Sequence, residues 1–182
     1  MHPLNKVGIK RLYQRILRTH PPRAELVLLL QSLENAINVG SLFRLADSLG
    51  AGELIFTGRT QTPPHPEISV TSVGHENRVP WRRIAQIEEA ITTLKAEGYH
   101  CLAVELCEEA VIYTEYPYPP KVCLVLGNEN KGVYRKTLAL CDGAAFIPMY
   151  GKGRSMNVHV AAALIGYQAL MGCGASDQTA QA

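Results

Sequence analysis

Residues 25–58 read ELVLLLQSLENAINVGSLFRLADSLGAGELIFTG, and this stretch decides the fold class. It opens with a continuous apolar run, which is typical of a strand buried on both faces of a sheet. Apolar residues then recur at helical spacing over 38–50, where we expect Asn38 to cap the start of a helix and Gly50 to cap its end. A second short apolar run follows. A strand, a helix and another strand in this order predict a parallel α/β unit.

The remaining sequence continues this alternation. We expect five strands in all, at 25–31, 53–58, 99–106, 121–127 and 144–148. We expect further helices at 85–98, 134–141 and about 156–171. Residues 59–80 hold four of the eleven prolines and predict a long loop with at most one helical turn, of the kind that often forms a lid or a binding surface. The fold class is therefore α/β, with a mostly parallel sheet and helices on both faces.

The composition describes an ordinary folded domain. Apolar residues make up 47% of the 182 residues and charged residues 19%, which is enough for one packed core and excludes general disorder. No apolar run reaches the roughly 18 residues of a membrane span, and the first residues lack the apolar stretch of a secretory signal. The five cysteines form no CxxC pair, which predicts free thiols in a reducing compartment. We therefore expect a cytoplasmic protein that contacts no membrane and holds no metal.

The charge of the chain is unevenly distributed. Residues 1–24 carry six of the 18 basic residues and no acidic residue, which leaves 12 basic and 16 acidic residues in the rest. This basic helical extension indicates a contact with nucleic-acid phosphates. The alternative is an amphipathic helix that packs on the domain through its apolar side chains. We expect the domain itself to span 25–172 and residues 173–182 to form a flexible tail.

Two glycine-rich turns resemble nucleotide-binding motifs but lack their key residues. GNENKG (127–132) is followed by Val133 and Tyr134, where a phosphate loop needs Lys and Ser or Thr. GKGRSM (151–156) has Met156 in place of the third glycine of a dinucleotide-binding fingerprint. Both turns nevertheless follow predicted parallel strands. Open α/β sheets bind their ligands at the carboxyl ends of such strands.

The side chains at these turns indicate the kind of ligand. Glu129 lies between two asparagines, and Ser155 and Asn157 lie around the start of the last helix, where backbone N–H groups are unpaired. Such a site suits a ligand with an adenine, a ribose and a zwitterionic amino acid better than a polyphosphate.

Two helices carry further expectations. Helical periodicity places Arg44 on the polar face of helix 38–50, which favours a solvated side chain that pairs with Asp47. The last helix is apolar nearly all round. It must be covered on more than one side, by the sheet and by a second subunit.

Three segments together resemble a known family. NVGSLFR (38–44), VLGNENKGV (125–133) and IPMYGKGRSMNVHVAAAL (147–164) are similar, in this order, to the three signature motifs of the SpoU (TrmH-type) branch of the SPOUT RNA methyltransferases. The resemblance covers residues 25 to about 172. It implies an α/β fold with a C-terminal deep trefoil knot, an exception to the near-absence of knots, in which S-adenosylmethionine binds. It also implies a homodimer that methylates a ribose 2′-hydroxyl of tRNA or rRNA.

The resemblance also assigns residues, position by position. It implies a catalytic set of Asn38, Arg44, Glu129, Ser155 and Asn157. It implies a cofactor-binding set of Val104, Leu126, Gly127, Ile147, Met149, Ser155 and Met156. Together with the basic extension, it implies RNA contacts by Lys10, Arg11, Arg15, Arg18 and Arg44. Because a guanidinium has a pKa of about 12.5 or more, we expect Arg44 to grip an RNA phosphate and stabilise the alkoxide rather than act as a base.

The chain departs from the family pattern at two places. ENAI (34–37) stands where Asp-Pro is usual, and RSMN (154–157) replaces the commoner Ser-Leu-Asn. Neither change removes a reactive group, although the first is expected to alter the turn that faces the substrate. Two alternatives stay open, a knotted base methyltransferase such as one for guanine N1, and a catalytically silent RNA-binding SPOUT protein. The pairing of NxGxxxR with SMN favours the ribose methyltransferase.

Overall fold

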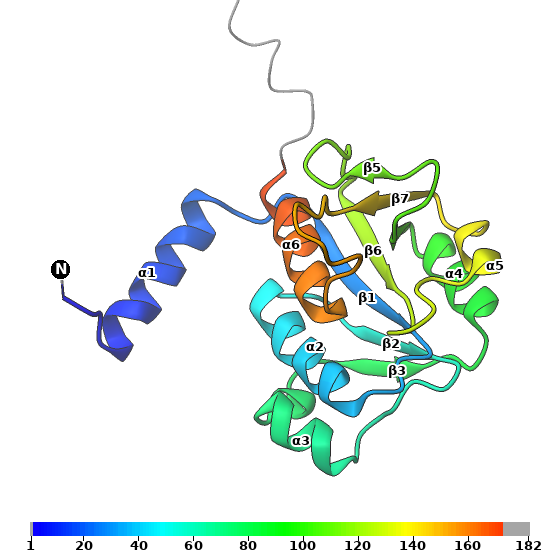
Figure 1. The fold of residues 1–182 in the computed structure, drawn as a ribbon. Coiled ribbons are helices and arrows are strands. Elements are labelled where there is room, and N and C mark those ends of the chain that lie inside the picture. Colours follow the sequence, from blue (N-terminus) through cyan, green and yellow to red (C-terminus); the bar gives the residue numbers. More distant parts are fainter. Residues whose placement is uncertain (1, 173–182) are drawn as a thin grey trace, which may run out of the picture.

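Seven strands form one sheet in the computed structural model, which describes residues 2–172 (Figure 1). In chain order the strands are β1 (Glu25–Gln31), β2 (Leu54–Thr57), β3 (Trp81–Arg83), β4 (His100–Val104), β5 (Val111–Ile112), β6 (Lys121–Leu126) and β7 (Gly143–Phe146). Their order in the sheet is β3-β2-β1-β6-β4-β7-β5, and all neighbouring pairs are parallel. The predicted α/β class is confirmed, whereas the expected tail at 173–182 lies outside the described residues.

Helices cover both faces of this sheet. One face carries α2 (Ala36–Leu49), α3 (Pro66–Ser72) and α6 (Val158–Met171), and the other carries α4 (Ile87–Ala96) and α5 (Arg135–Leu138). Alternate residues of β1 enter the two cores: Leu28 packs on the side of α2, and Leu29 packs on the side of α4. The apolar run of β1 is therefore continuous because both of its faces are buried, as the sequence predicts.

The caps of α2 confirm one expectation and correct another. Gly50 ends the helix in the left-handed region, with φ of 63°, where glycine carries no steric penalty. The helix begins three residues earlier than predicted, however, because its N-cap is Asn35, whose side chain accepts the Ile37 N–H at 2.9 Å. The expectation that Asn38 is the cap was wrong. Asn38 lies in the first turn, where its side chain is free to contact other elements.

The proline-rich segment 59–80 contains more structure than predicted. It holds α3 and a short 3₁₀ helix, η1 (His75–Asn77), and the edge strand β3 follows it. Packing against α2 explains α3, because a Cβ on Gly40 would lie 2.8 Å from the Ile68 carbonyl oxygen and Ile68 is fully buried. Contacts between segments distant in sequence, which local periodicity does not report, stabilise these short elements.

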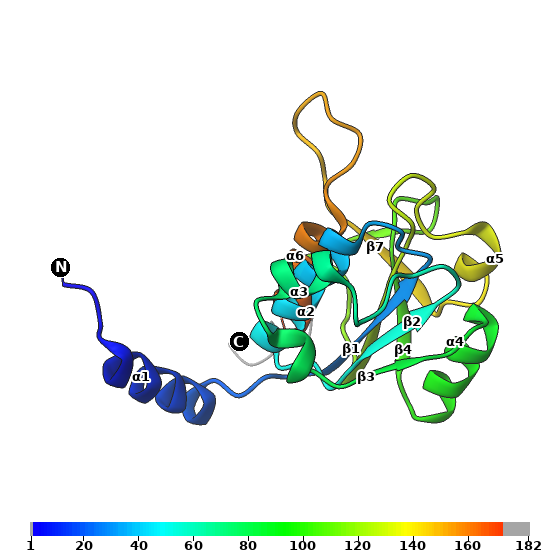
Figure 2. The same ribbon diagram turned by 90° about the horizontal axis from the view of Figure 1, so that it is seen from below.

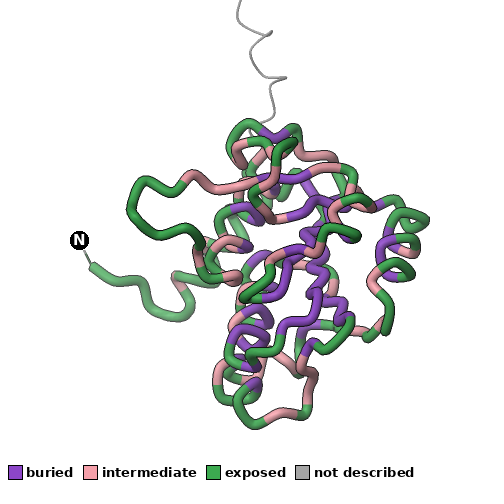
Figure 3. The backbone as a smooth tube through the Cα atoms, turned by 45° about the vertical axis from the view of Figure 1, so that its right-hand side comes forward, coloured by how far each residue is buried: buried purple, intermediate pink, exposed green. Residues whose placement is uncertain are grey.

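The N-terminal helix α1 (Lys6–Thr19) stands apart from the sheet and its covering helices (Figures 1 and 2). None of its residues is buried, and Figure 3 shows the segment as exposed almost throughout. The alternative in which α1 packs on its own domain was therefore wrong. The chain rejoins the domain at Arg23, whose backbone N–H donates to the Leu170 carbonyl at the end of α6, at 2.8 Å.

Candidate active site

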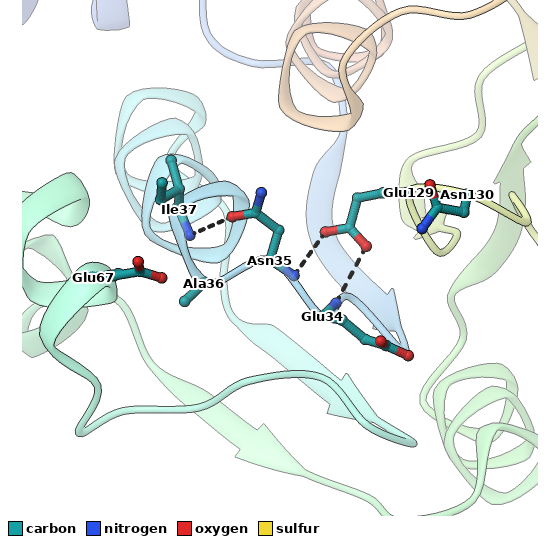
Figure 4. A pocket seen from close by; sticks show the side chains of 7 residues that line it. All are labelled: Glu34, Asn35, Ala36, Ile37, Glu67, Glu129 and Asn130. Atoms are coloured by element: carbon teal, nitrogen blue, oxygen red, sulfur yellow. Dashed lines mark hydrogen bonds between the residues drawn. The ribbon is translucent and has the colours of Figure 1, made fainter.

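The carboxylate of Glu129 gathers groups from two other segments at the carboxyl edge of the sheet. Its oxygens accept the backbone N–H of Glu34 at 3.2 Å and of Asn35 at 3.1 Å, as drawn in Figure 4. One oxygen also accepts the side-chain amide of Asn38 at 3.1 Å. Three donors on one carboxylate fix the turn after β1 and the start of α2 against the loop after β6.

Asn38 links Glu129 to the third sequence motif through a second hydrogen bond. The side-chain amide of Asn157 donates to Asn38 Oδ1 at 3.2 Å, and Asn157 Oδ1 accepts the His159 N–H as the N-cap of α6. Only 6% of Asn38 is exposed. We call Glu129, Asn38 and Asn157 the Glu129 cluster. The structure thus brings together one predicted catalytic residue from each of the three sequence motifs.

The loop that presents Glu129 is folded tightly on itself. Asn128 and Gly132 exchange two backbone hydrogen bonds, of 3.0 and 2.8 Å. A Cβ on Gly127 would lie 2.1 Å from the Val133 nitrogen and from the carbonyl carbon of Gly132, so no larger residue fits there without moving the backbone. This close approach explains the glycine in the second motif.

Glu105 belongs to this site although it was not predicted. Its Oε2 accepts the Val133 N–H at 2.7 Å and occupies the space that a Cβ on Gly132 would need. The bond ties the segment after β4 to the loop after β6. The sequence placed Glu105 inside a strand at 99–106, but β4 ends at Val104, which frees the carboxylate for the loop.

The predicted cofactor residues at the strand ends lie on three neighbouring strands. Val104 ends β4, Leu126 ends β6, and Ile147 directly follows β7. The register pairs Val104 with Ala145 of β7. Leu126 is fully buried, so it could contact a cofactor only through its backbone. Val104 and Ile147 are half-buried at the edge of the core.

The other predicted cofactor residues lie in the loop between β7 and α6. This loop projects from the body of the molecule (Figure 2). Met149 is 41% exposed, Met156 is half-buried, and Ser155 is exposed. Within the described chain, Ser155 makes no hydrogen bond to the Glu129 cluster. The structure brings Asn157 to the cluster and leaves Ser155 outside it.

Arg44 does not face the Glu129 cluster of its own chain. It follows Asn38 by six residues, which places it about 240° around the axis of α2 at about 100° per residue. The residue is exposed, and its side chain has no hydrogen bond or ion pair with any described residue. The expected pair with Asp47 was wrong, because Asp47 Oδ2 lies 3.2 Å from His75 Nδ1 instead.

Next to Arg44, α6 presents an uncovered apolar side. The Tyr167 hydroxyl lies 3.5 Å from the carbonyl oxygen of Ser48, one helical turn beyond Arg44. The large apolar side chains exposed on α6 are Val160, Leu164, Tyr167 and Met171, with exposed fractions from 39 to 71%. The opposite side of the helix is buried against the domain. The sheet and α2 therefore cover α6 on one side only.

His159 is a second site residue that sequence reasoning missed. It lies in the first turn of α6, two residues after Asn157. Its Nδ1 is buried and has no hydrogen-bond partner among the residues that the structure describes. Burial lowers the pKa of its imidazole from the ordinary value of 6.5, so the side chain is neutral at pH 7. His159 lies inside the segment 147–164 that resembles the third motif, and this is the sequence signal that could have identified it.

A cavity of about 470 Å³ opens beside the cluster. Figure 4 shows the residues that line it: Glu34, Asn35, Ala36, Ile37, Glu67, Glu129 and Asn130.

Over residues 2–172, no group of three or more His, Cys, Asp or Glu side chains is arranged to hold a metal ion. No helix in the same range is long and apolar enough to cross a membrane.

Comparison with known proteins agrees with this arrangement. Residues 25–167 match the model of the SpoU rRNA Methylase family. The tRNA (guanosine(18)-2′-O)-methyltransferase of Escherichia coli is 30% identical over 169 residues, which are 91% of this chain and 70% of that enzyme. The enzyme of the same name from Thermus thermophilus is 33% identical over 160 residues, covering 88% of this chain and 80% of its own.

Solved structures show the same fold. The S-adenosylmethionine-bound rRNA methyltransferase from Sinorhizobium meliloti matches with a TM-score of 0.76 and 25% identity, over 91% of this chain and 69% of that one. The A. aeolicus TrmH/SpoU tRNA modifying enzyme matches with a TM-score of 0.72 and 26% identity, over 89% and 82%. The SpoU methyltransferase AviRb from Streptomyces viridochromogenes matches with a TM-score of 0.74 and 27% identity, over 85% of this chain, which spans 62% of the AviRb chain.

Proposed function

The chain belongs to the SpoU rRNA methylase family, and we propose that it transfers the methyl group of S-adenosylmethionine to a ribose 2′-hydroxyl of tRNA or rRNA at the Glu129 cluster. The observation that carries this proposal is the hydrogen-bonded chain from Glu129 through Asn38 to Asn157. It joins the three motifs at the carboxyl edge of a parallel sheet, where such folds bind ligands. tRNA is the first substrate to test, since two relatives are named for guanosine 18 of tRNA.

S-adenosylmethionine, once bound, supplies a methyl group on a positively charged sulfur. The backbone at Val104, Leu126, Gly127 and Ile147, with the side chains of Met149 and Met156, would hold it. Neutral groups of this kind suit an adenosine and require no metal.

The protein's own contribution is to position the ribose. Asn157 and Ser155 orient the 2′-hydroxyl, and Glu129 holds Asn38 and the turn at Glu34 and Asn35 in place. Alignment of the oxygen with the methyl group removes much of the activation free energy of methyl transfer, because positioning alone can lower it by roughly 7–11 kcal/mol. This role requires the loop that carries Ser155 to close over the strand ends when the substrate binds.

The site is completed by a second copy of the chain. Arg44 points away from the cluster of its own subunit and lies beside the exposed apolar side of α6. Association through this side buries the apolar residues, which is favourable. It also brings Arg44 of the partner subunit toward the cluster, where its guanidinium grips an RNA phosphate and stabilises the developing alkoxide. The functional unit is a homodimer.

The proposal has three further parts. The trefoil knot implied by the family resemblance would be formed by segments that leave β4, β6 and β7, and the Glu105–Val133 hydrogen bond between two of these segments supports it. The basic side of α1, with Lys10, Arg11, Arg15 and Arg18, provides the RNA contact outside the active site. The four cysteines in the described chain are free thiols, which supports a reducing, cytoplasmic location.

The experiment that tests this function identifies the methylated product. The protein is incubated with S-adenosylmethionine carrying a deuterated methyl group and with unmodified tRNA and rRNA, and the nucleosides are analysed by mass spectrometry. We expect the label on the ribose of 2′-O-methylnucleosides. Label on a base, as in 1-methylguanosine, would instead support the knotted base methyltransferase. RNA binding without any labelled nucleoside would support the silent RNA-binding protein.

A further inference from the structure

The cavity beside the Glu129 cluster has an acidic wall, and its carboxylates differ in how they are engaged. Glu129 accepts three N–H groups. Glu34 forms an ion pair with Arg59, at 2.8 Å. The carboxylate of Glu67 has no hydrogen bond or ion pair with any described residue. Of the three acidic side chains that line the cavity, only Glu67 has both oxygens available to a ligand.

The position of Glu67 is fixed by the helix that carries it. Glu67 follows Pro66 in the first turn of α3, and His65 caps this turn. The next residue, Ile68, is fully buried, and Gly40 of α2 allows the close approach of α3. Figure 4 shows the Glu67 side chain pointing from α3 towards the turn at Asn35 and Ala36. The carboxylate is therefore presented to the cavity from a well-packed element.

A carboxylate without a hydrogen-bond partner, placed in a site for RNA, favours chemical groups that donate hydrogen bonds. It repels phosphates and accepts hydrogen bonds only, so the bound group must donate. Guanine presents two adjacent donors, the ring N1–H and the exocyclic amine, which match the two oxygens of a carboxylate. Adenine and cytosine place a ring-nitrogen acceptor beside their amine, and uracil places a carbonyl on each side of its single N–H. Guanine is the base that this cavity accommodates best.

We propose that Glu67 selects the base of the methylated nucleotide by accepting both donors of a guanine. This inference rests on the proposed function, because the ribose must lie at the Glu129 cluster for its base to enter the adjoining cavity. The pocket, of about 470 Å³, is open to solvent and Glu67 is exposed, so a base that projects from a bound RNA can reach the carboxylate. Reading an exposed base by its hydrogen-bonding edge in a pocket is a common mode of RNA recognition.

The test compares wild type with Glu67→Gln, which keeps the shape of the side chain and replaces one acceptor with a donor. Unmodified tRNA is the substrate, and mass spectrometry measures each of the four 2′-O-methylnucleosides. We expect wild type to form 2′-O-methylguanosine, and E67Q to form it at least about tenfold more slowly, as for the loss of a bidentate base contact. The matched control is Glu88→Gln on α4, an exposed residue on the opposite face of the sheet, which should leave the rate unchanged.

Calorimetry with S-adenosylmethionine completes the test, and its affinity should be unchanged by E67Q. A parental rate of guanosine methylation in E67Q would overturn the assignment, as would a loss of S-adenosylmethionine affinity in this variant. If wild type methylates only adenosine, cytidine or uridine riboses, the inference about Glu67 fails while the proposed function stands. If wild type forms no 2′-O-methylnucleoside, the proposed function fails and the inference fails with it.

Discussion

Glu129 is the residue on which the geometry of the site depends. Its three donors come from residues 91 to 95 positions earlier in the chain. Hydrogen bonds to a charged acceptor are stronger than those between neutral groups, so this single carboxylate holds the start of α2 against the loop after β6. Asn38 then transmits that order to Asn157 and to α6.

Arg44 gives the first prediction at the residue scale. Arg44→Ala should change the free energy of unfolding by less than about 0.5 kcal/mol, because the side chain is exposed. Single-turnover methyl transfer should nevertheless fall roughly a hundredfold or more, as for the loss of one preorganised donor. Arg44→Lys should restore little, because the ammonium lacks the planar fork of the guanidinium. Near-parental transfer by Arg44→Ala would place Arg44 on the surface and outside the site.

Gly127 gives the second prediction. In Gly127→Ala the new Cβ would lie 2.1 Å from backbone atoms of Gly132 and Val133, so the loop that presents Glu129 must open. We expect a loss of about 1–3 kcal/mol in the free energy of unfolding, as for other overpacked sites, together with weaker S-adenosylmethionine binding. Chemical denaturation and calorimetry measure the two effects. Gly151→Ala is the matched control, because a Cβ there meets no atom within 4 Å. Equal behaviour of the two variants would refute the steric argument.

At the scale of elements, the sequence predicted what local patterns determine. The apolar run of β1 and the glycine cap of α2 were both correct, because burial on two faces and a left-handed cap each leave a direct mark on the residues involved. The short α3 was missed, since its stability comes from packing on Gly40 of α2. The short edge strands β3 and β5 were missed for the same reason, because their pairing partners, not their own residues, define them.

The sequence likewise predicted some features of the candidate site and missed others. The motifs identified Glu129, Asn38 and Asn157, and the fold brings them together. No pattern in the sequence indicates that Glu129 accepts the backbone N–H groups of the turn after β1, because every residue except proline carries such a group. The role of Glu105 was hidden by a strand boundary placed two residues too late.

The element α1 gives the third prediction. Arg11, Arg15 and Arg18 lie at spacings of four and three, so they share one side of this exposed helix. Replacing all three by Glu should weaken RNA binding and reduce its dependence on salt concentration, because fewer counterions are released. S-adenosylmethionine affinity should stay the same, since α1 stands apart from the site (Figure 1). Parental RNA affinity with a parental salt slope would mean that α1 does not contact RNA.

For the molecule as a whole, the proposed dimer covers the exposed apolar side of α6. Light scattering at micromolar concentration should give twice the 20.0 kDa of the single chain. Leu164→Glu, which places a charge on the apolar side of α6, should shift this mass toward that of the monomer, because a buried unpaired charge is costly. A monomeric wild type would contradict the proposed dimer.

Subunit mixing tests whether the two copies share a site. Arg44→Ala and Glu129→Gln should each be inactive as homodimers. A mixed dimer would contain one complete site, in which the Glu129 cluster of one subunit receives Arg44 of the partner subunit. After denaturation and refolding of an equal mixture, we expect about a quarter of the parental activity, because half of the dimers are mixed and each has one active site. If the mixture stays as inactive as its components, Arg44 acts within its own subunit.

Single-turnover methylation by Glu129→Gln tests the proposal that the Glu129 cluster positions a ribose hydroxyl for methyl transfer. The amide keeps the length of the side chain, but it turns an acceptor into a donor that faces the N–H groups of the cluster. With saturating S-adenosylmethionine and unmodified tRNA, we expect the rate of 2′-O-methylnucleoside formation to fall about a hundredfold or more, with cofactor affinity unchanged. Glu88→Gln should react at the parental rate. A parental rate for Glu129→Gln would show that the Glu129 cluster does not position the ribose.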